Sequence, residues 1–84
     1  MNSSIDEEEK FKIYPVPASD YINLTSTISD ELNYQLYDMQ GRVLLTGKFS
    51  NFMYLNLENL PTGNYVIRLY NANEEHREKI IISR

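Results

Sequence analysis

The chain alternates apolar and polar residues with a period of two, in short runs that turn residues interrupt every eight to twelve positions. Successive side chains of a β-strand point to opposite faces of its sheet, so this period indicates half-buried strands. No segment carries the 3.6-residue apolar stripe of a helix over ten or more residues. The pattern predicts seven short strands, at residues 11–14, 21–25, 33–38, 42–46, 52–57, 65–70 and 77–83. Such spacing favours an all-β, seven-stranded antiparallel immunoglobulin-like β-sandwich, with a small open barrel as the alternative.

The same alternation predicts which side chains face the core. The inward set comprises Ile22, Leu24, Met53, Leu55, Leu57, Ile80 and Ile82. Tyr34 and Leu36 share one face of their strand, and Tyr65, Ile67 and Leu69 share one face of theirs. Between the strands, Asp38 to Gly41 reads as a tight hairpin turn in which Gly41 takes positive φ. Residues 47–51 and 71–75 are expected to be connections. Pro15 and Pro17 lack the amide proton of a central strand, which places them at a strand end or a sheet edge.

Length and charge limit the classes of function. Eighty-four residues suggest one small domain at residues 11–84, preceded by a flexible acidic lead-in at residues 1–10. With a net charge of −4 and only eight scattered Lys and Arg residues, nucleic acid is not an expected partner. The chain has no Cys for disulfides, no apolar run long enough to span a membrane, and a polar, acidic start unlike a signal peptide.

No catalytic or metal-binding constellation is evident, so we read the chain as a non-enzyme without cofactor or metal. His76 is the only imidazole and is expected in a solvated turn, away from any nucleophile that it could activate. The Asp residues at 20, 30 and 38 fall in turns, where their side chains commonly accept hydrogen bonds from backbone amides. The three glycines lie too far apart for a phosphate-binding loop.

Two features suggest binding or processing. The tyrosines at 14, 34, 37, 54 and 70 could form an exposed stripe that binds sugar or protein, although we favour half-buried rings with hydroxyls in contact with water.

Leu60-Pro61-Thr62-Gly63 looks like a gram-positive sortase signal but lacks the residue between Pro and Thr, and a strand follows it. We read it as a bend, with Gly63 supplying positive φ and the Tyr65 hydroxyl bonded to upstream backbone, as in a tyrosine corner.

Four motifs occur in a fixed order: Phe11-Lys-Ile-Tyr-Pro-Val-Pro-Ala-Ser-Asp20, Leu36-Tyr-Asp-Met-Gln-Gly-Arg-Val43, Leu57 to Leu69 with its Leu-Pro-Thr-Gly-Asn-Tyr centre, and Arg77 to Arg84. Together they resemble the C-terminal sorting domain of the type IX secretion system of Bacteroidota, type A (the Por secretion family). The resemblance spans Phe11 to Arg84. One position departs from the family, because Val16 stands where Asn is usual.

The resemblance implies that the domain is an address label on a cargo protein that precedes it in the parent chain. The cargo passes through the periplasm to the outer-membrane translocon and its shuttle protein, and ends at the cell surface or outside. A sortase-like peptidase then removes the domain, often attaching the cargo to lipopolysaccharide. We expect the cut in or before the lead-in, since exposed segments before compact domains are favoured sites of proteolysis. An immunoglobulin-like adhesion or carbohydrate-binding module, or a structural spacer, are the alternatives.

The resemblance also implies which residues carry the signal. The motif set is Pro15, Pro17, Gly41, Arg42, Leu60, Pro61, Gly63 and Tyr65, and the C-terminal strand adds Lys79, Ile80, Ile82 and Arg84. A terminal strand at a sheet edge can be recognised through its backbone, with side chains adding specificity. Ile80 and Ile82 also read as core residues, so we expect Lys79 and Arg84 to be the cleaner positions for substitution.

Overall fold

The computed structural model describes residues 10–84, and within that range the chain forms seven strands and no helix. The strands are β1 (Phe11–Tyr14), β2 (Tyr21–Ser26), β3 (Leu32–Asp38), β4 (Val43–Phe49), β5 (Phe52–Asn56), β6 (Gly63–Tyr70) and β7 (Glu75–Ile82). The all-β prediction is confirmed. Among the described residues, none forms a helix with the length and apolar character needed to cross a lipid bilayer.

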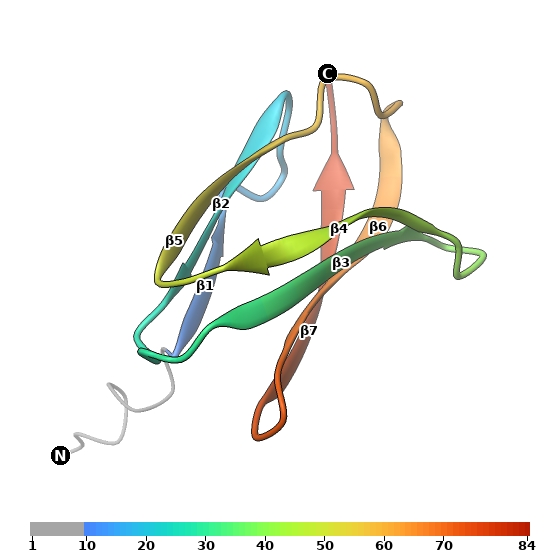
Figure 1. Cartoon of the computed structure of the whole chain (residues 1–84). Coiled ribbons are helices and arrows are strands. Elements are labelled where there is room, and N and C mark those ends of the chain that lie inside the picture. Colours follow the sequence, from blue (N-terminus) through green and yellow to red (C-terminus); the bar gives the residue numbers. More distant parts are fainter. Residues whose placement is uncertain (1–9) are drawn as a thin grey trace, which may run out of the picture.

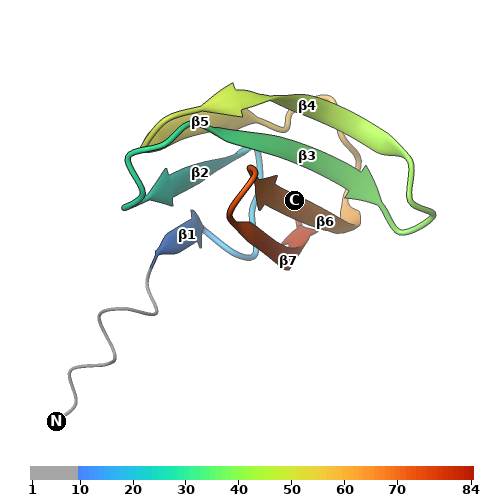
Figure 2. The ribbon, with the colours of Figure 1, turned by 60° about the horizontal axis from the view of Figure 1, so that its bottom comes forward.

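The strands form two antiparallel sheets that face each other (Figure 1; Figure 2). One has three strands in the order β1-β2-β5, and the other has four in the order β4-β3-β6-β7. This order is consistent with an immunoglobulin-like sandwich. It differs from the constant-type arrangement because the fourth strand pairs with β3 and not with β5.

Both sheets contribute side chains to one core between them. Nine large side chains have less than 2% of their surface exposed: Ile22, Leu24, Leu32, Leu36, Leu57, Ile67, Leu69, Ile80 and Ile82. Eight of them lie at inward-facing positions of β2, β3, β6 and β7, as the pleat requires, and Leu57 directly follows β5. The predicted inward set is buried as expected, except that Met53 is only partly buried against the core.

Strand β4 is longer than the sequence pattern indicated. Gly47, placed in a connection by the prediction, lies inside β4 opposite Tyr34 of β3. A Cβ atom built on Gly47 would lie 2.7 Å from the Tyr34 hydroxyl and 2.8 Å from its ring, so the ring occupies the space over the glycine. The glycine therefore makes room for an aromatic neighbour and does not end the strand.

The segment between β1 and β2, two neighbouring strands of one sheet, reaches across to the edge of the other sheet. It contains Pro15 and Pro17, each preceded by a cis peptide bond, and both lie outside the strands as predicted. Ala18 then pairs with Ile82 of β7 in a parallel bridge. The Ala18 amide donates to the Ile81 carbonyl at 2.7 Å, and the Ser83 amide donates to the Ala18 carbonyl at 2.7 Å. The bridge joins the three-stranded sheet to the edge of the four-stranded one.

Candidate functional site

The four sequence motifs meet at one end of the sandwich, which we call the motif end: residues 15–20, 38–42, 57–63 and 82–84. Strands β1, β3, β5 and β7 finish there, and β2, β4 and β6 begin there. In Figure 1 the carboxyl end of β7 and the segment leading into β6 lie close together at the top. Lys10, the first described residue, lies at the opposite end, before β1.

Arg84 links three of the four motif segments. Its Nε donates to Oδ1 of Asp20 at 2.9 Å, and its Nη2 donates to the Leu57 carbonyl at 2.7 Å. Its Nη1 donates to the Leu60 carbonyl. A guanidinium carries five N–H donors in one plane, so it can serve three separate acceptors at once. The side chain of Arg84 is 30% exposed, which leaves this cluster at the surface but partly shielded from water.

Tyr65 closes the segment between β5 and β6. Its ring is buried, and its hydroxyl donates a hydrogen bond of 2.6 Å to the carbonyl of Pro61, four residues upstream. This is the tyrosine corner that the sequence predicted, so that prediction is confirmed. Only Gly41 among the glycines of residues 10–84 has positive φ, at 92°. The prediction of positive φ at Gly63 is therefore wrong; Pro61 and the Tyr65 hydrogen bond shape the bend without it.

The turn between β3 and β4 is organised by Asp38. Its Oδ1 accepts from the backbone amides of Gln40 at 2.9 Å and Arg42 at 3.0 Å, and its Oδ2 accepts from the Arg42 Nε at 2.8 Å. The Arg42 amide is the main cause that holds the pKa of Asp38 below its ordinary value, with the Arg42 side chain and the Gln40 amide adding to it. The carboxylate stays ionised at neutral pH and is suited to fixing the turn, not to delivering a proton.

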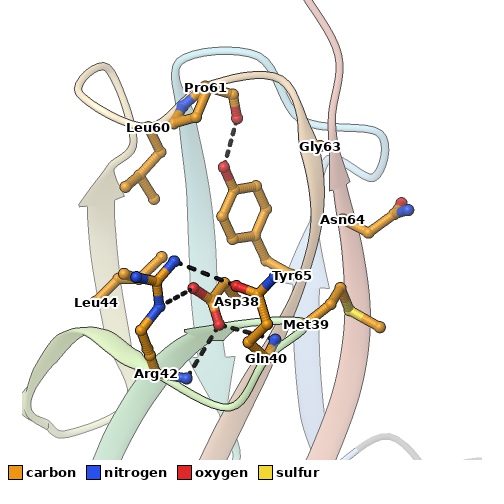
Figure 3. A pocket seen from close by; sticks show the side chains of 10 residues that line it. All are labelled: Asp38, Met39, Gln40, Arg42, Leu44, Leu60, Pro61, Gly63, Asn64 and Tyr65. Carbon is orange, nitrogen blue, oxygen red and sulfur yellow. Dashed lines mark hydrogen bonds and ion pairs between the residues drawn. The ribbon is translucent and has the colours of Figure 1, made fainter.

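The turn and the tyrosine corner face each other across a shallow pocket of about 350 Å³ (Figure 3). Leu44, Leu60, Pro61 and Tyr65 give it apolar walls, and Asp38, Met39, Gln40, Arg42, Gly63 and Asn64 complete its lining. Five predicted signal residues thus line one pocket: Arg42, Leu60, Pro61, Gly63 and Tyr65. Gly41 lies in the turn beside it. Such a mixed, open pocket can accept an apolar group of a partner while its charged rim orients that partner.

Comparison with known proteins identifies the family. Residues 12–83 match the family model described as the secretion system C-terminal sorting domain. The chain belongs to this family. The resemblance to type IX sorting domains is thereby confirmed, and sorting domains of this family are non-catalytic. The five predicted signal residues that line the pocket therefore belong to a sorting domain.

Two curated proteins share sequence with this sorting domain. Beta-agarase D of Zobellia galactanivorans is 32% identical over 76 residues, which are 89% of this chain and 15% of that protein. The 4-alpha-glucanotransferase of Haemophilus influenzae is 36% identical over 55 residues, which are 66% of this chain and 8% of that protein. The chain therefore spans a small part of each of these longer relatives.

The remaining predicted signal residues of the sorting domain differ in burial and in contacts. Pro15 and Pro17 lie exposed in the segment between β1 and β2. Ile80 and Ile82 are fully buried, opposite Tyr65 and Gly63 of β6, so they act as core residues. Lys79 is exposed on β7, away from the pocket. Arg84, expected to be a cleaner position for substitution than Ile80 or Ile82, is bound to two carbonyls and a carboxylate, so its replacement would also remove structural contacts.

The structure of the sorting domain corrects one further prediction and adds one contact that the sequence did not indicate. His76 lies within β7 and not in a turn; it is half-buried, its ring stacks on Phe11 at 5.1 Å, and its Nε2 lies 3.1 Å from Glu78 Oε1. The alternating pattern did not place His76 in a strand because its neighbours in the sequence are all charged, as is typical of a loop. The sequence also gave no signal for the pairing of Asp20 with Arg84, which are 64 residues apart. Within residues 10–84, no cluster of three or more His, Asp or Glu side chains could hold a metal.

The proposed stripe of five tyrosines does not exist as one surface. Tyr34 is buried, and Tyr37 and Tyr70 lie half-buried on the four-stranded sheet, where the Arg68 guanidinium covers the Tyr70 ring at 3.9 Å. Tyr14 and Tyr54 are exposed on the three-stranded sheet. Half-buried packing, the favoured interpretation, therefore holds for Tyr37 and Tyr70, while Tyr14 and Tyr54 remain open to solvent.

Proposed function

We propose that this domain directs the export of a cargo protein, joined to its N-terminal side, through the outer-membrane translocon of the type IX secretion system. The observation that carries the proposal is the meeting of all four family motifs at one end of the sandwich, opposite the end at which Lys10 enters β1. A cargo attached before Lys10 would leave the motif end free for contact with the translocon and its shuttle protein.

The surface around the motif end supports a recognition role. Val16, Met39, Val43 and Leu44 are large apolar side chains exposed in or directly beside it. Protein interfaces typically combine an apolar centre with polar residues at the rim, and Arg42, Gln40 and Asn64 supply that rim around the pocket. Val16 replaces the Asn usual in the family, and here it adds to the apolar surface.

The free edge of β7 offers a second mode of contact. β7 is the last strand of its sheet, and among residues 10–84 the bridge from Ala18 covers it only near Ile82. Backbone groups farther along β7 are open to an added strand, and the exposed Lys79 lies beside them. We infer that a partner strand could read this edge while the motif-end pocket receives a side chain.

Processing would follow export. We propose that a sortase-like peptidase cuts in or before the acidic lead-in at residues 1–10, releasing the cargo or transferring it to lipopolysaccharide. Residues 1–9 lie outside the described part of the structure, and Lys10 is exposed. The Leu60-Pro61-Thr62-Gly63 bend is unsuited to cleavage because the Tyr65 and Arg84 hydrogen bonds hold its backbone in place. Mass spectrometry of exported cargo should find no cut between Phe11 and Arg84.

The cargo itself is suggested by the relatives. Beta-agarase D is an enzyme of which the matched region is 15%. We propose that the parent of this chain is likewise a secreted enzyme or surface protein that passes through the periplasm and reaches the cell surface or the medium. The present domain would contribute its address and no catalysis.

A reporter fusion tests the proposal. A red fluorescent protein is placed between a periplasmic signal peptide and residues 1–84 and expressed in a host with the type IX system and in its translocon-deficient mutant. We expect surface or medium fluorescence in the first host and periplasmic retention in the second. Met39→Ser combined with Leu44→Ser, on the pocket side, should reduce export, whereas Lys12→Ser on the far sheet should not. Retention of the unaltered fusion in the competent host would contradict a sorting function.

A further inference from the structure

The outer face of the three-stranded sheet carries an aromatic groove that the sorting motifs do not explain. Strand register places its side chains in two rows that cross the sheet, Tyr14–Asn23–Tyr54 and Lys12–Thr25–Phe52. All six alternate with inward residues such as Ile13, Leu24 and Leu55, so they point away from the core. Phe52 begins β5 at the end of the sandwich opposite the motif end, so the face extends away from that site.

The groove is the strip along β2 between the aromatic side chains of the two outer strands. Neighbouring strands lie about 4.8 Å apart, so side chains on β1 and β5 stand about 10 Å apart on either side of β2. Tyr14 on one side and Phe52 and Tyr54 on the other flank the shorter Asn23 and Thr25 between them. Tyr21, on the same face of β2, stands at the end of this strip nearest the motif end and stacks on Tyr54. A surface pocket lined by Lys12, Ile13, Tyr14 and Thr25 opens on its β1 side.

The flanking aromatic side chains are exposed and partly held in place. Phe52 is 56% exposed, Tyr54 55% and Tyr14 44%, which is a high fraction for aromatic side chains gathered on one face. Tyr21 stacks on Tyr54 with ring centroids 5.1 Å apart and planes 11° apart, which restricts how the Tyr54 ring can turn. Within residues 10–84, the side chain of Asn23 makes no hydrogen bond, so its donor and acceptor are available to a ligand.

The charge of the face indicates an uncharged occupant. Lys12 is the one charged side chain among the two rows, whereas the outer face of the other sheet carries Arg68, Glu75, Arg77 and Lys79. Sugar rings present C–H faces that pack on aromatic rings and hydroxyls that bond to amide and hydroxyl groups, which is the pairing that the flanking aromatic rings and the amide and hydroxyl side chains between them supply. We propose that this groove binds a chain of neutral sugars.

Such a chain could come from two sources with the same chemistry. One is the sugar chain of the lipopolysaccharide on the producing cell, and the other is an extracellular polysaccharide that the exported cargo meets. The proposal is independent of sorting, since the groove lies on a sheet face and the sorting motifs lie at the motif end.

Affinity electrophoresis of the 84-residue chain tests the proposal. Native gels contain a soluble neutral galactan, a soluble neutral glucan, or lipopolysaccharide purified from a host with a type IX system. We expect retardation in at least one gel, with apparent affinity weakened about tenfold or more by Tyr54→Ala and unchanged by Tyr70→Ala, a tyrosine on the outer face of the other sheet. Retardation by lipopolysaccharide alone would assign the first source, and retardation by galactan or glucan alone the second.

A second measurement keeps the test decisive if Tyr54→Ala does not fold. Titration of the unaltered chain with the same polysaccharides, followed by nuclear magnetic resonance, should shift signals of Tyr14, Asn23, Phe52 and Tyr54 and leave those of Tyr37 and Tyr70 in place. Absence of both retardation and shifts with all three polysaccharides would overturn the proposal. So would equal retardation of Tyr54→Ala and Tyr70→Ala, or a dimer in sedimentation that Tyr54→Ala abolishes, since a second copy would then occupy the groove.

Discussion

Arg84 is the residue on which the long-range contacts of the motif end converge. It binds the carbonyls of Leu57 and Leu60 and the carboxylate of Asp20, which belong to two other motifs. The carbonyls would otherwise need water, and the carboxylate would lose its partner. The side chain of Arg84 therefore acts as a structural clamp. Any role of Arg84 in recognition has to be distinguished from this structural role.

Replacing Arg84 with Ala should lower the free energy of unfolding by about 1–3 kcal/mol, because three charge-assisted hydrogen bonds are lost at a partly exposed site. Arg84→Lys should restore only part of this, since one ammonium group cannot reach all three acceptors in the same plane. Urea unfolding followed by circular dichroism measures both changes.

Lys79→Ala is the control for this measurement, because Lys79 is exposed on β7 and its removal should change stability by less than about 0.5 kcal/mol. If Arg84→Ala is as stable as the unaltered chain, the clamp is not a structural element. If Arg84→Ala is stable but is not exported, Arg84 takes part in recognition directly. If Arg84→Ala is unstable, a loss of export says nothing about direct recognition.

Asp38 gives the turn at the pocket a dependence on pH. Its pKa is below the ordinary value of 3.8 in the folded chain, chiefly through the Arg42 amide. A depressed folded pKa stabilises the fold above the unfolded pKa, and this stabilisation is lost as pH falls from about 4 through the lower folded pKa. The difference in melting temperature between the unaltered chain and Asp38→Asn should therefore shrink between pH 6 and pH 2.5.

Asp30→Asn serves as the comparison, since Asp30 lies in an exposed loop at the opposite end of the sandwich. Its melting temperature should stay close to that of the unaltered chain at each pH. A difference for Asp38→Asn that is the same at pH 6 and pH 2.5 would mean that the carboxylate hydrogen bonds do not stabilise the turn.

At the scale of the elements, the pairing of β3 with β4 depends on a glycine beneath an aromatic ring. Gly47→Ala would place a Cβ atom within 2.8 Å of the Tyr34 ring, whose side chain is buried and cannot move freely. We expect a loss of about 1–3 kcal/mol from this overpacking, measured by thermal and urea unfolding.

Gly63→Ala is the matched control, because a Cβ atom there would lie 3.7 Å from the Tyr65 ring, an ordinary contact, and the backbone does not have positive φ. It should cost less than about 1 kcal/mol even though Gly63 belongs to a family motif. Equal losses in the two variants would contradict the steric explanation for Gly47.

The contrast between these glycines shows what the sequence could predict about the elements. Alternation located all seven strands and the core faces of β2, β3, β6 and β7, because a one-residue shift would expose the apolar set. It misjudged the length of β4 because Gly47 reads as a turn residue unless the position of Tyr34 is known. It misplaced His76 for the same reason, since Phe11, its stacking partner, is 65 positions away in the chain.

At the scale of the whole molecule, contacts at both ends join the two sheets. At the motif end they are the Ala18 bridge to β7 and the hydrogen bonds of Arg84. At the other end, Phe11 of β1 stacks on His76 of β7. The motifs identified the family, but they could not show that they meet in space, because that depends on the register of seven strands. The outward-facing groove was likewise hidden, since it combines Tyr14 and Tyr54 from strands 40 positions apart.

These cross-sheet contacts predict that the domain unfolds as one unit. All buried apolar residues of both sheets belong to a single cluster, so neither sheet can lose its partner without exposing the core. Native-state hydrogen exchange should give the central strands β2 and β6 opening free energies that agree within about 0.5 kcal/mol, with faster exchange in the loop at residues 71–74. Arg84→Ala should lower the values for β2 and β6 equally, because it weakens a contact between the sheets. If the opening free energy of β2 is instead more than about 2 kcal/mol lower than that of β6, the three-stranded sheet is a separate unit. The Arg84 clamp then does not hold the two sheets together.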